Sequence, residues 1–291
     1  GFYGKQGICD AKGGKCMKFG IREICDVVLR AKDDVKIGNQ TFKADEPVIY
    51  FDSAKTSSVE GAATTVYATG GRGNSRLIAW EGEKTVTFTM EDALLSPLGF
   101  SILSGAGLVD AAKVDGGMKV HTTLTTVVDV TSGINVNLAE LTGKEIAEEK
   151  AYAFIMKDGQ IVERLKPATP SDGSVTFTRN GKASGPLTGE QTVMVDFYVK
   201  VETGAVEMTI EPDKFGGFYY LEASTLFRRQ DNGQDMAAAF VIPKVKIQSN
   251  FTFAMASSGD PSTFTFTMDA FPDYTKFDKT KEVLFVLQII E

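Results

Sequence analysis

Thr-Val-Thr-Phe-Thr-Met-Glu-Asp-Ala, at residues 85–93, is the stretch of sequence that most clearly decides the fold. Its first six residues alternate between small polar and large apolar side chains, and successive side chains of a strand point to opposite faces of a sheet. Val86, Phe88 and Met90 therefore share one face, and the threonines share the other. The pattern predicts a half-buried β-strand whose apolar face lies on a core.

A similar pattern lies near the other end of the chain, as Thr-Phe-Thr-Phe-Thr-Met-Asp-Ala at residues 263–270. Two equivalent strands that pair with each other would explain this repeated pattern. An internal duplication or simple convergence would also explain it, since Thr and Phe are both common in strands. Paired strands are the interpretation that we carry forward.

One short α-helix is predicted directly after the first of these strands. Ser96 can cap its N-terminus, Pro97 suits the first helical position, and Gly105 can end the helix in a left-handed conformation. Phe100 is then expected to face a neighbouring molecule or solvent. The residues expected to pack on the sheet are Leu98, Ile102 and Leu103.

Strands are also predicted upstream, at residues 48–51 and 64–68. A turn or loop of small residues follows these strands, and the next strand begins at Leu77. It lacks the lysine of a phosphate-binding loop and leads into a strand, so we do not expect it to bind phosphate. The turn consists of Gly70, Gly71, Arg72, Gly73 and Asn74.

The middle of the chain, from Met118 to about Leu187, has short strands separated by polar turns, the spacing typical of a small β-sandwich. Pro243 cannot donate a ladder hydrogen bond, which places its strand at an edge or at a bulge. The last predicted strand is apolar on both faces and is expected to be deeply buried or sandwiched between subunits. The strands predicted after Met118 are 124–130, 134–138, 151–156, 161–165, 175–178, 193–201, 206–210, 218–227, 237–247, 250–254, 262–268 and 283–290.

These elements predict a mainly β fold, a β-sandwich or barrel with one short α-helix and an inserted small β-sandwich module. The expected organisation is an N-terminal arm at 1–35, the first part of a β-domain at 36–109, the inserted module at 110–190 and the second part of the β-domain at 191–291. At 291 residues, one large core or one core with a smaller module is expected.

Composition and charge exclude several classes of protein. Apolar residues make up 43% of the chain and charged residues 24%, as in ordinary globular proteins. The net charge of -7 disfavours a protein that grips nucleic acid through clustered Lys and Arg. The chain opens without a signal-peptide core and has no apolar run long enough for a membrane helix. We therefore expect a soluble product of the cytoplasm with no membrane anchor.

Residues that carry chemistry are sparse. The cysteines, Cys9, Cys16 and Cys25, lie far in sequence from the single histidine, His121, which favours free or buried thiols over a zinc site. One strand histidine cannot build a triad or a metal site, and the carboxylates at 91–92 are adjacent, so they point to different sides. We attribute those carboxylates to the helix N-terminus. No catalytic residue, metal or cofactor is predicted, and we expect a protein that is not an enzyme.

The stretch from Thr65 to Ser96, with its glycine-rich turn, alternating strand and helix cap, resembles the hairpin and following helix of phage tail tube proteins. Residues 221–229, the turn at 231–235, residues 240–247 and residues 257–270 resemble the closing strands of such proteins. The resemblance covers somewhat under half of the chain. It implies stacked rings, commonly six-fold, around a lumen lined by strands of every subunit. Residues 110–190 exceed the compact family and would decorate the outside of the tube.

The resemblance also implies a location and a set of partners. The protein would be made in the host cytoplasm and assembled into the virion tail, and its partners would be other copies of itself and tail proteins such as a sheath or baseplate. DNA would pass through the lumen without specific binding, because an acidic lumen repels phosphate. The candidate assembly contacts are Phe2, Tyr3, Gly70, Gly71, Arg72, Gly73, Asn74, Phe100 and Pro243.

Two other functions remain open from the sequence. One is a β-sandwich surface or adhesion module that binds a carbohydrate or protein receptor, and the other is a different virion part such as a baseplate or capsid decoration. Trp80 or the aromatic run at 218–220 could form a carbohydrate platform. Consecutive aromatic residues of a strand alternate between faces, however, which favours a role in the core and at an interface.

Overall fold

The computed structural model describes residues 18–21, 23, 26–38, 40–105, 107–131, 133–181, 187–214, 216–255, 257–259 and 262–290. The chain divides into two compact units. The first comprises Gly1–Leu108 and Met208–Glu291, and the second comprises Val109–Glu207. Each unit has a hydrophobic core of its own.

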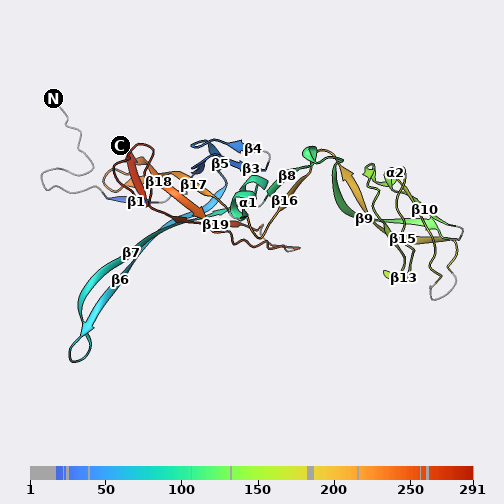
Figure 1. Ribbon diagram of the computed structural model, residues 1–291, viewed down its shortest axis with the longest axis horizontal. Helices are drawn as coiled ribbons and strands as arrows, with labels where there is room; N and C mark the ends of the chain where they lie inside the picture. The colour runs from blue at the N-terminus through green and yellow to red at the C-terminus, as the bar shows by residue number, and fades with distance from the viewer. Residues whose placement is uncertain are drawn as a thin grey trace. The chain divides into compact units, whose positions relative to one another are not determined.

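The first unit is built on one open antiparallel sheet, and most of its strands are labelled in Figure 1. Within the described residues this sheet does not close into a barrel. The predicted mainly β fold is confirmed, but a barrel is not formed by a single chain. The strand order is β5 (Pro47–Phe51), β2 (Asp26–Ala31), β17 (Phe218–Arg229), β18 (Asp235–Ile247), β19 (Phe264–Ala270), β7 (Ser75–Asp92) and β6 (Ala54–Gly70), with β1 (Phe19–Ile21) on β17 and β20 (Val286–Ile290) on β18.

The two similar sequences, at residues 85–93 and 263–270, form neighbouring strands. β7 and β19 pair antiparallel, with Phe266 opposite Met90 and Met268 opposite Phe88. All four of these side chains are at most 1% exposed. The alternation read from the sequence therefore places one apolar row of each strand in the core of the first unit.

The predicted helix is present as α1 (Pro97–Ser104). The Ser96 side chain accepts a hydrogen bond from the Gly99 amide at 2.9 Å, and Gly105 ends the helix with a φ of 69°. Ile102 and Leu103 are buried in the core, and Leu98 packs partly buried against it. The carboxylates at 91–92 do not serve this helix, because they lie at the end of β7.

Phe100 is not on the outside of the helix, so that expectation is wrong. It is 3% exposed, and its ring centroid lies 5.1 Å from that of Phe251 and 5.2 Å from that of Phe253. Phe251 and Phe253 come from residues 250–254, where a strand was predicted. The described chain forms no strand there, and these two rings instead cover the helix.

Pro243 lies at a bulge in an interior strand, not at an edge. The register between β17 and β18 shifts between Tyr219 and Leu221, opposite Pro243. On its other side, β18 pairs with β20 over Ala237–Val241 and with β19 over Val245–Ile247. Pro243 thus occupies the gap between two partner strands, where its missing N–H costs no ladder hydrogen bond.

The last strand, β20, is less buried than predicted. Leu287 is 41% exposed and Ile290 is 60% exposed. Deep burial within one chain is therefore wrong for this strand, whereas burial between subunits stays a prediction. The first unit is completed by the short pair β3 (Val35–Ile37) and β4 (Gln40–Phe42).

The chain crosses between the units within β8 (Gly107–Asp110) and β16 (Val206–Thr209), which pair with each other. The boundary predicted at residue 190 is too early, because β15 (Glu190–Val201) pairs with β9 and β12 of the second unit. Its sheet runs β11 (Glu145–Ile146), β15, β12 (Tyr152–Lys157) and β13 (Gln160–Arg164), with β9 (Met118–Asp129) also on β15, and β10 (Ile134–Asn137) pairs separately with β14 (Ser174–Phe177).

A second helix, α2 (Leu138–Thr142), was not predicted. The residue before it, Asn137, caps its N-terminus by accepting from the Glu140 amide, and Gly143 ends it with a φ of 65°. The predicted strand at 134–138 therefore stops one residue early and turns into this helix. A single-turn 3-10 helix at Ala111–Lys113 precedes β9.

Glu163 is a buried charge that the second unit satisfies completely. The carboxylate is 3% exposed, and Arg179 donates to it from Nε at 2.7 Å and lies within 2.6 Å through Nη2. The amides of Asn180 and Gly181 donate to its other oxygen at 2.9 and 3.1 Å. The hydrogen bond from Arg179 lowers the pKa of Glu163 and outweighs the effect of burial, which would raise it.

Candidate assembly surfaces

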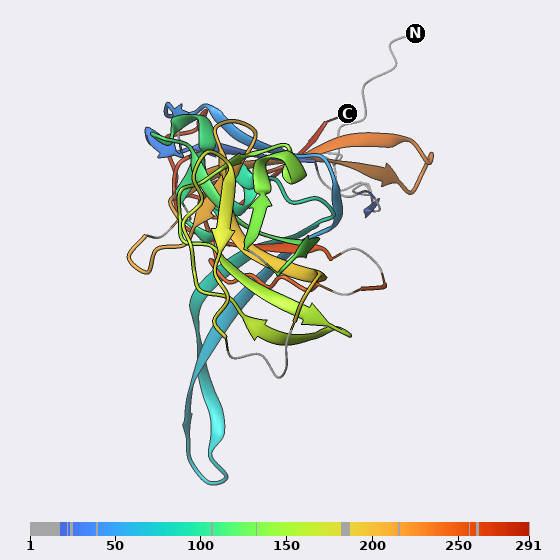
Figure 2. The same cartoon turned by 90° about the vertical axis from the view of Figure 1, so that its right-hand side faces the viewer.

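The most unusual feature of the first unit is a long β-hairpin formed by β6 and β7 (cyan in Figures 1 and 2). The pairing runs from Ala54 opposite Asp92 to Gly70 opposite Ser75. The glycine-rich turn forms its tip, where Gly71, Gly73 and Asn74 adopt φ values of 78°, 88° and 51°. These left-handed conformations suit glycine and asparagine in a tight hairpin turn.

Only the base of this hairpin belongs to the larger sheet. β19 covers β7 from Thr87 to Asp92, and beyond Thr87 the described chain adds no further strand to either edge of the ribbon. We call residues 61–86 the distal hairpin. With few exceptions its residues are exposed on both faces. Because a lone two-stranded ribbon is marginally stable in water, this length of hairpin calls for a partner.

One face of the distal hairpin is apolar. Cross-strand partners share a face, and the register pairs Val66 with Trp80 and Ala68 with Ile78. Val66 is 60% exposed, Ile78 54% and Trp80 52%. We call these four residues the apolar hairpin face. A contiguous exposed patch of this kind marks an interaction surface more often than a chance exposure.

The opposite face of the distal hairpin is polar. Tyr67 pairs with Ala79, and Thr69 pairs with Arg76 across a bulge that leaves Leu77 unpaired. The guanidinium of Arg76 lies 4.1 Å from the centre of the Tyr67 ring. This cation–π contact orders the polar side near the tip. The ribbon is thus amphipathic, although neither of its faces reaches the core.

The base of the hairpin presents a different surface, opposite the core. Three rows of side chains cross β6, β7 and β19, and most of their members carry hydroxyl groups. We call this surface the hydroxyl face. Its rows are Thr56, Glu91 and Thr265, then Ser58, Thr89 and Thr267, then Glu60, Thr87 and Asp269, so that they carry three carboxylates and no basic residue.

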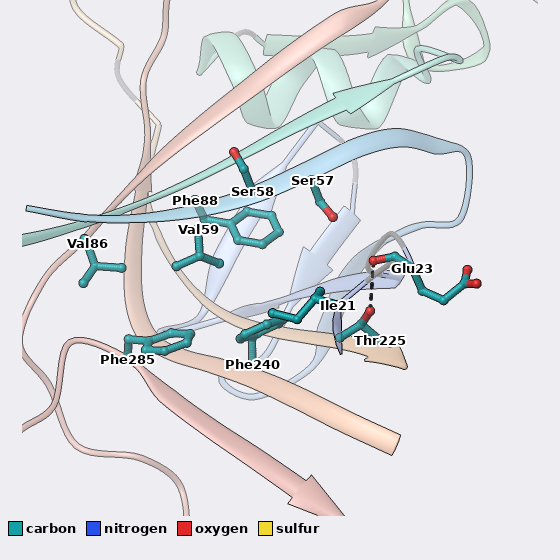
Figure 3. A pocket seen from close by; sticks show the side chains of 11 residues that line it. Ile21, Glu23, Ser57, Ser58, Val59, Val86, Phe88, Thr225, Phe240 and Phe285 are labelled. Atoms are coloured by element: carbon teal, nitrogen blue, oxygen red, sulfur yellow. Dashed lines mark hydrogen bonds between the residues drawn. The ribbon is translucent and has the colours of Figure 1, made fainter. Parts of the chain in front are cut away.

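An apolar cavity opens beside the base of the hairpin (Figure 3). Val59, Val86 and Phe88 of the hairpin face Phe240 of β18 and Phe285 across a volume of about 560 Å³. Phe240 and Phe285 stack, with ring centroids 5.5 Å apart. Since Phe88 and Phe240 also belong to the core, the cavity is an open end of that core.

A second cavity of about 400 Å³ shares Glu23 and Thr225 with the first. It runs along Ala237, Ala238 and Ala239 of β18. We call the two cavities together the groove. Thr225 fixes one wall by donating its hydroxyl to the Glu23 carbonyl at 3.1 Å, as Figure 3 shows.

The charged residues that line the groove are acidic, namely Glu23 and Asp26. The nearby cation Arg228 binds both carboxylate oxygens of Asp235 at 2.6 and 2.9 Å. This hydrogen bond lowers the pKa of Asp235, so the pair stays ionised at neutral pH. The hydrogen bond with Asp235 raises the pKa of Arg228, and the nearby charge of Glu23 also contributes, so this cation acts on the groove as well.

The structure places the predicted contact residues in three different situations. Gly70 lies at the hairpin tip and residues 71–74 are exposed there, whereas Phe100 and Pro243 are buried inside the first unit. Phe2, Tyr3 and the three cysteines lie outside the described residues. Sequence reasoning missed the apolar hairpin face, although the apolar residues at 66–68 and 77–80 signalled it.

The residues considered for chemistry do not converge. The imidazole Nε2 of His121 lies 2.8 Å from an Asp196 oxygen on the exposed surface of the second unit. No group of three or more His, Cys, Asp or Glu among the described residues could hold a metal ion. None of the helices in the described chain is long and apolar enough to cross a membrane.

The described residues of the first unit thus form an open antiparallel sheet, from which an amphipathic hairpin extends. The model of the YomU/Tube protein family matches residues 20–284, and the chain belongs to this family. The resemblance to phage tail tube proteins is thereby confirmed, and the chain is a phage tube-like structural protein and a component of the virion. A search of curated proteins found no significant match.

Proposed function

We propose that this protein is the subunit of a phage tail tube, which it builds by self-assembly into stacked rings without catalysing a reaction. The observation that carries the proposal is the distal hairpin. It exposes Val66, Ile78 and Trp80 on one face of a ribbon that is open at both edges. Burying such a face against other copies removes apolar area from water, at roughly 25 cal/mol per Å².

The open sheet supports a ring in particular. A single chain leaves β5 and β6 at the ends of its strand order. Exposed edges template pairing with further strands, and a closed ring of copies is one way to remove them. The exposed side chains of β20 add a further surface that neighbouring copies would cover.

We further propose that the hydroxyl face lines the lumen through which DNA passes. Its threonine and serine hydroxyl groups are hydrated, and Glu60, Glu91 and Asp269 repel phosphate. DNA would then slide past without lasting contacts, because no basic residue in these rows can exchange with its counterions. The opposite surface of the same strands is occupied by the core.

The second unit fits a role outside the tube wall. Its own core includes Phe177, Phe197 and Ile155, each at most 1% exposed. A domain that buries its own core needs no neighbouring copy for stability. We propose that it decorates the tube.

Negative-stain microscopy of the purified protein tests tube formation. We expect rings and tubes of constant diameter as the concentration rises. A species that stays monomeric at high concentration and under crowding would contradict the proposal. The lumen assignment needs a separate test, in which Thr89→Lys and Thr267→Lys leave tubes intact and slow DNA ejection from assembled virions. Unchanged ejection kinetics would place the lumen on another surface.

A further inference from the structure

The sheet of the second unit has one protected edge and one unprotected edge. At the protected edge, β13 is only five residues long, its pairing with β12 contains a bulge, and it carries the buried charge of Glu163. Each of these features hinders the addition of a further strand. β9, at the other edge, has none of them, because residues 120–128 contain no proline or charged residue and the register with β15 runs from Met118 to Asp129 without a shift.

The outer side of β9 is open. All twelve residues of this strand pair with β15, and the described chain adds no strand to its other side. Every second N–H and C=O group of such an edge strand points away from the sheet. Its apolar row is incompletely covered as well, since Val120 lies opposite the buried Val199 and is itself 38% exposed. β9 is therefore a site at which an extended strand can be added.

The sequence of β9 is complementary to itself. Residues 119–129 read Lys-Val-His-Thr-Thr-Leu-Thr-Thr-Val-Val-Asp. If a second copy of this strand is placed antiparallel and centred on Leu124, valine meets valine, threonine meets threonine, and the lysine at one end meets the aspartate at the other. The facing pairs are 119 with 129, 120 with 128, 121 with 127, 122 with 126, 123 with 125, and 124 with 124.

We propose that the outer edge of β9 pairs antiparallel with β9 of a second copy, so that two second units share one continuous sheet. The facing residues are both odd-numbered or both even-numbered. Backbone groups that point away from β15 in one copy therefore meet the equivalent groups of the other, and side chains of the same face meet. Leu124 and Val128, which pack partly buried on the core of their own unit, would then be covered by the second copy.

The charges at the two ends of β9 select this register. Asp129 lies opposite Glu190, and like charges on facing positions of a sheet are unfavourable. The Thr131 side chain and amide lower the pKa of Asp129, so its carboxylate is charged at neutral pH. Lys119, which bonds to Glu149 of its own chain, would also reach Asp129 of the second copy. A shift of the register by two residues would separate these two charges.

The contact is two-fold and closed, because the same surface is used by both copies. Copies in rings that all point the same way are not related by such an axis, so we place the contact between unassembled copies. The second unit does not need it to fold, since its core is buried within one chain. The inference goes beyond the tube function and does not depend on it.

Two double variants test the pairing and its register. Thr123 faces Thr125 of the second copy, and both are exposed. Thr123→Lys/Thr125→Lys therefore brings like charges together, whereas Thr123→Lys/Thr125→Glu brings opposite charges together. Sedimentation equilibrium is measured below the concentration at which tubes form. We expect the wild type to dimerise with a Kd of about 10 μM, the lysine–lysine variant to bind about 100-fold more weakly, and the lysine–glutamate variant to dimerise like the wild type.

A matched control adds the same two charges to the opposite edge of the sheet. Gln160 and Ile161 of β13 are exposed, and Gln160→Lys/Ile161→Lys should dimerise like the wild type. Hydrogen–deuterium exchange then locates the contact. Amides of residues 118–129 should exchange more slowly in the wild-type dimer than in the lysine–lysine variant, which should have the same unfolding free energy and still form tubes.

The outcomes separate this inference from the tube function. A wild type that stays monomeric, or a lysine–glutamate variant that binds as weakly as the lysine–lysine variant, would show that the pairing is wrong. Loss of the dimer in the β13 control, or a dimer that leaves β9 unprotected, would place the contact on another surface. Loss of tubes in the lysine–lysine variant would show that the β9 edge belongs to the tube. A wild type that dimerises through β9 but forms no tubes would contradict the tube function alone.

Discussion

The second unit and the distal hairpin are both antiparallel β structure, yet only one of them is complete. In the second unit, β15 is flanked by β9 on one edge and by β11 and β12 on the other, and its inward side chains are fully buried. In the distal hairpin, β6 and β7 have each other and no cover within the described chain. Strands of similar length are thus self-sufficient in one place and dependent on partners in the other.

The difference shows how the chain separates folding from assembly. The second unit buries its apolar residues on folding, whereas the apolar hairpin face stays in water until another copy arrives. Changes in the second unit should therefore alter stability, and changes in the distal hairpin should alter assembly. The predictions below follow from this division.

Replacing residues 66–80 by Asn-Gly should have the largest effect. It shortens the hairpin to a two-residue turn between Thr65 and Glu81, which are cross-strand partners. We expect tubes to disappear in negative stain even at about 100-fold higher concentration. The unfolding free energy of the monomer should change by less than about 1 kcal/mol, because the removed side chains are mostly exposed.

Asp158→Asn serves as the matched control, since it introduces the same Asn-Gly sequence at the two-residue turn between β12 and β13 of the second unit, where Asp158 and Gly159 already adopt positive φ. It should assemble normally. Tubes formed by the shortened protein would show that assembly does not need the distal hairpin, and would contradict the division between a self-sufficient second unit and a partner-dependent hairpin.

Glu163→Ala should destabilise the second unit by about 3 kcal/mol, because it leaves Arg179 and two amides without their buried acceptor. Chemical denaturation measures the effect, and Glu148→Ala at an exposed site of the same unit should change stability by less than about 0.5 kcal/mol. Tube formation should persist at temperatures where the unit stays folded. A loss of tubes without unfolding would show that the second unit takes part in assembly.

Trp80→Ala should weaken assembly by about 2 kcal/mol, or roughly 30-fold in concentration, as expected for a large aromatic anchor. The folded monomer should keep its stability, because Trp80 is 52% exposed there. Sedimentation velocity measures the assembly threshold. The control is Tyr152→Ala in the second unit, where 44% of the tyrosine is exposed. Equal effects of the two changes would remove the distinction between the regions.

The smallest effect should come from pH. The pKa of Glu163 is lowered by Arg179, so its contribution to stability is complete above the ordinary carboxyl pKa and is lost as the pH falls through the lowered value. Unfolding of the second unit should therefore become easier below about pH 4.5. Glu163→Gln should remove this part of the pH dependence. An unchanged pH profile in that variant would assign the dependence to other carboxylates.

Much of the local structure could be predicted because it is encoded by short-range patterns. The alternation at 85–90, the cap at Ser96 and the left-handed Gly105 each act within a few residues. The burial of Phe100 could not be predicted, since it depends on Phe251 and Phe253, about 150 residues away in the sequence.

The assembly surfaces show the same limit. The glycine-rich turn could be recognised in the sequence, whereas the apolar residues at 66–68 and 77–80 could not be assigned to one face, because bulges at Leu77 and near Gly82 interrupt the alternation of β7. Because each bulge adds one residue to β7, its apolar residues no longer recur at every second position and read in the sequence as a continuous apolar run. The groove could not be predicted from the sequence, since it is lined by side chains of β1, β6, β7 and β18 that only the fold brings together.

Hydrogen–deuterium exchange on both regions tests the central claim most directly. Peptides from residues 61–86 and from β15 should be compared in wild-type protein within tubes and in the same protein below its assembly concentration. We predict that β15 is protected in both states, whereas the distal hairpin exchanges rapidly when unassembled and slowly within tubes. A distal hairpin that exchanges at the same rate in both states would contradict the claim that assembly supplies its missing partner.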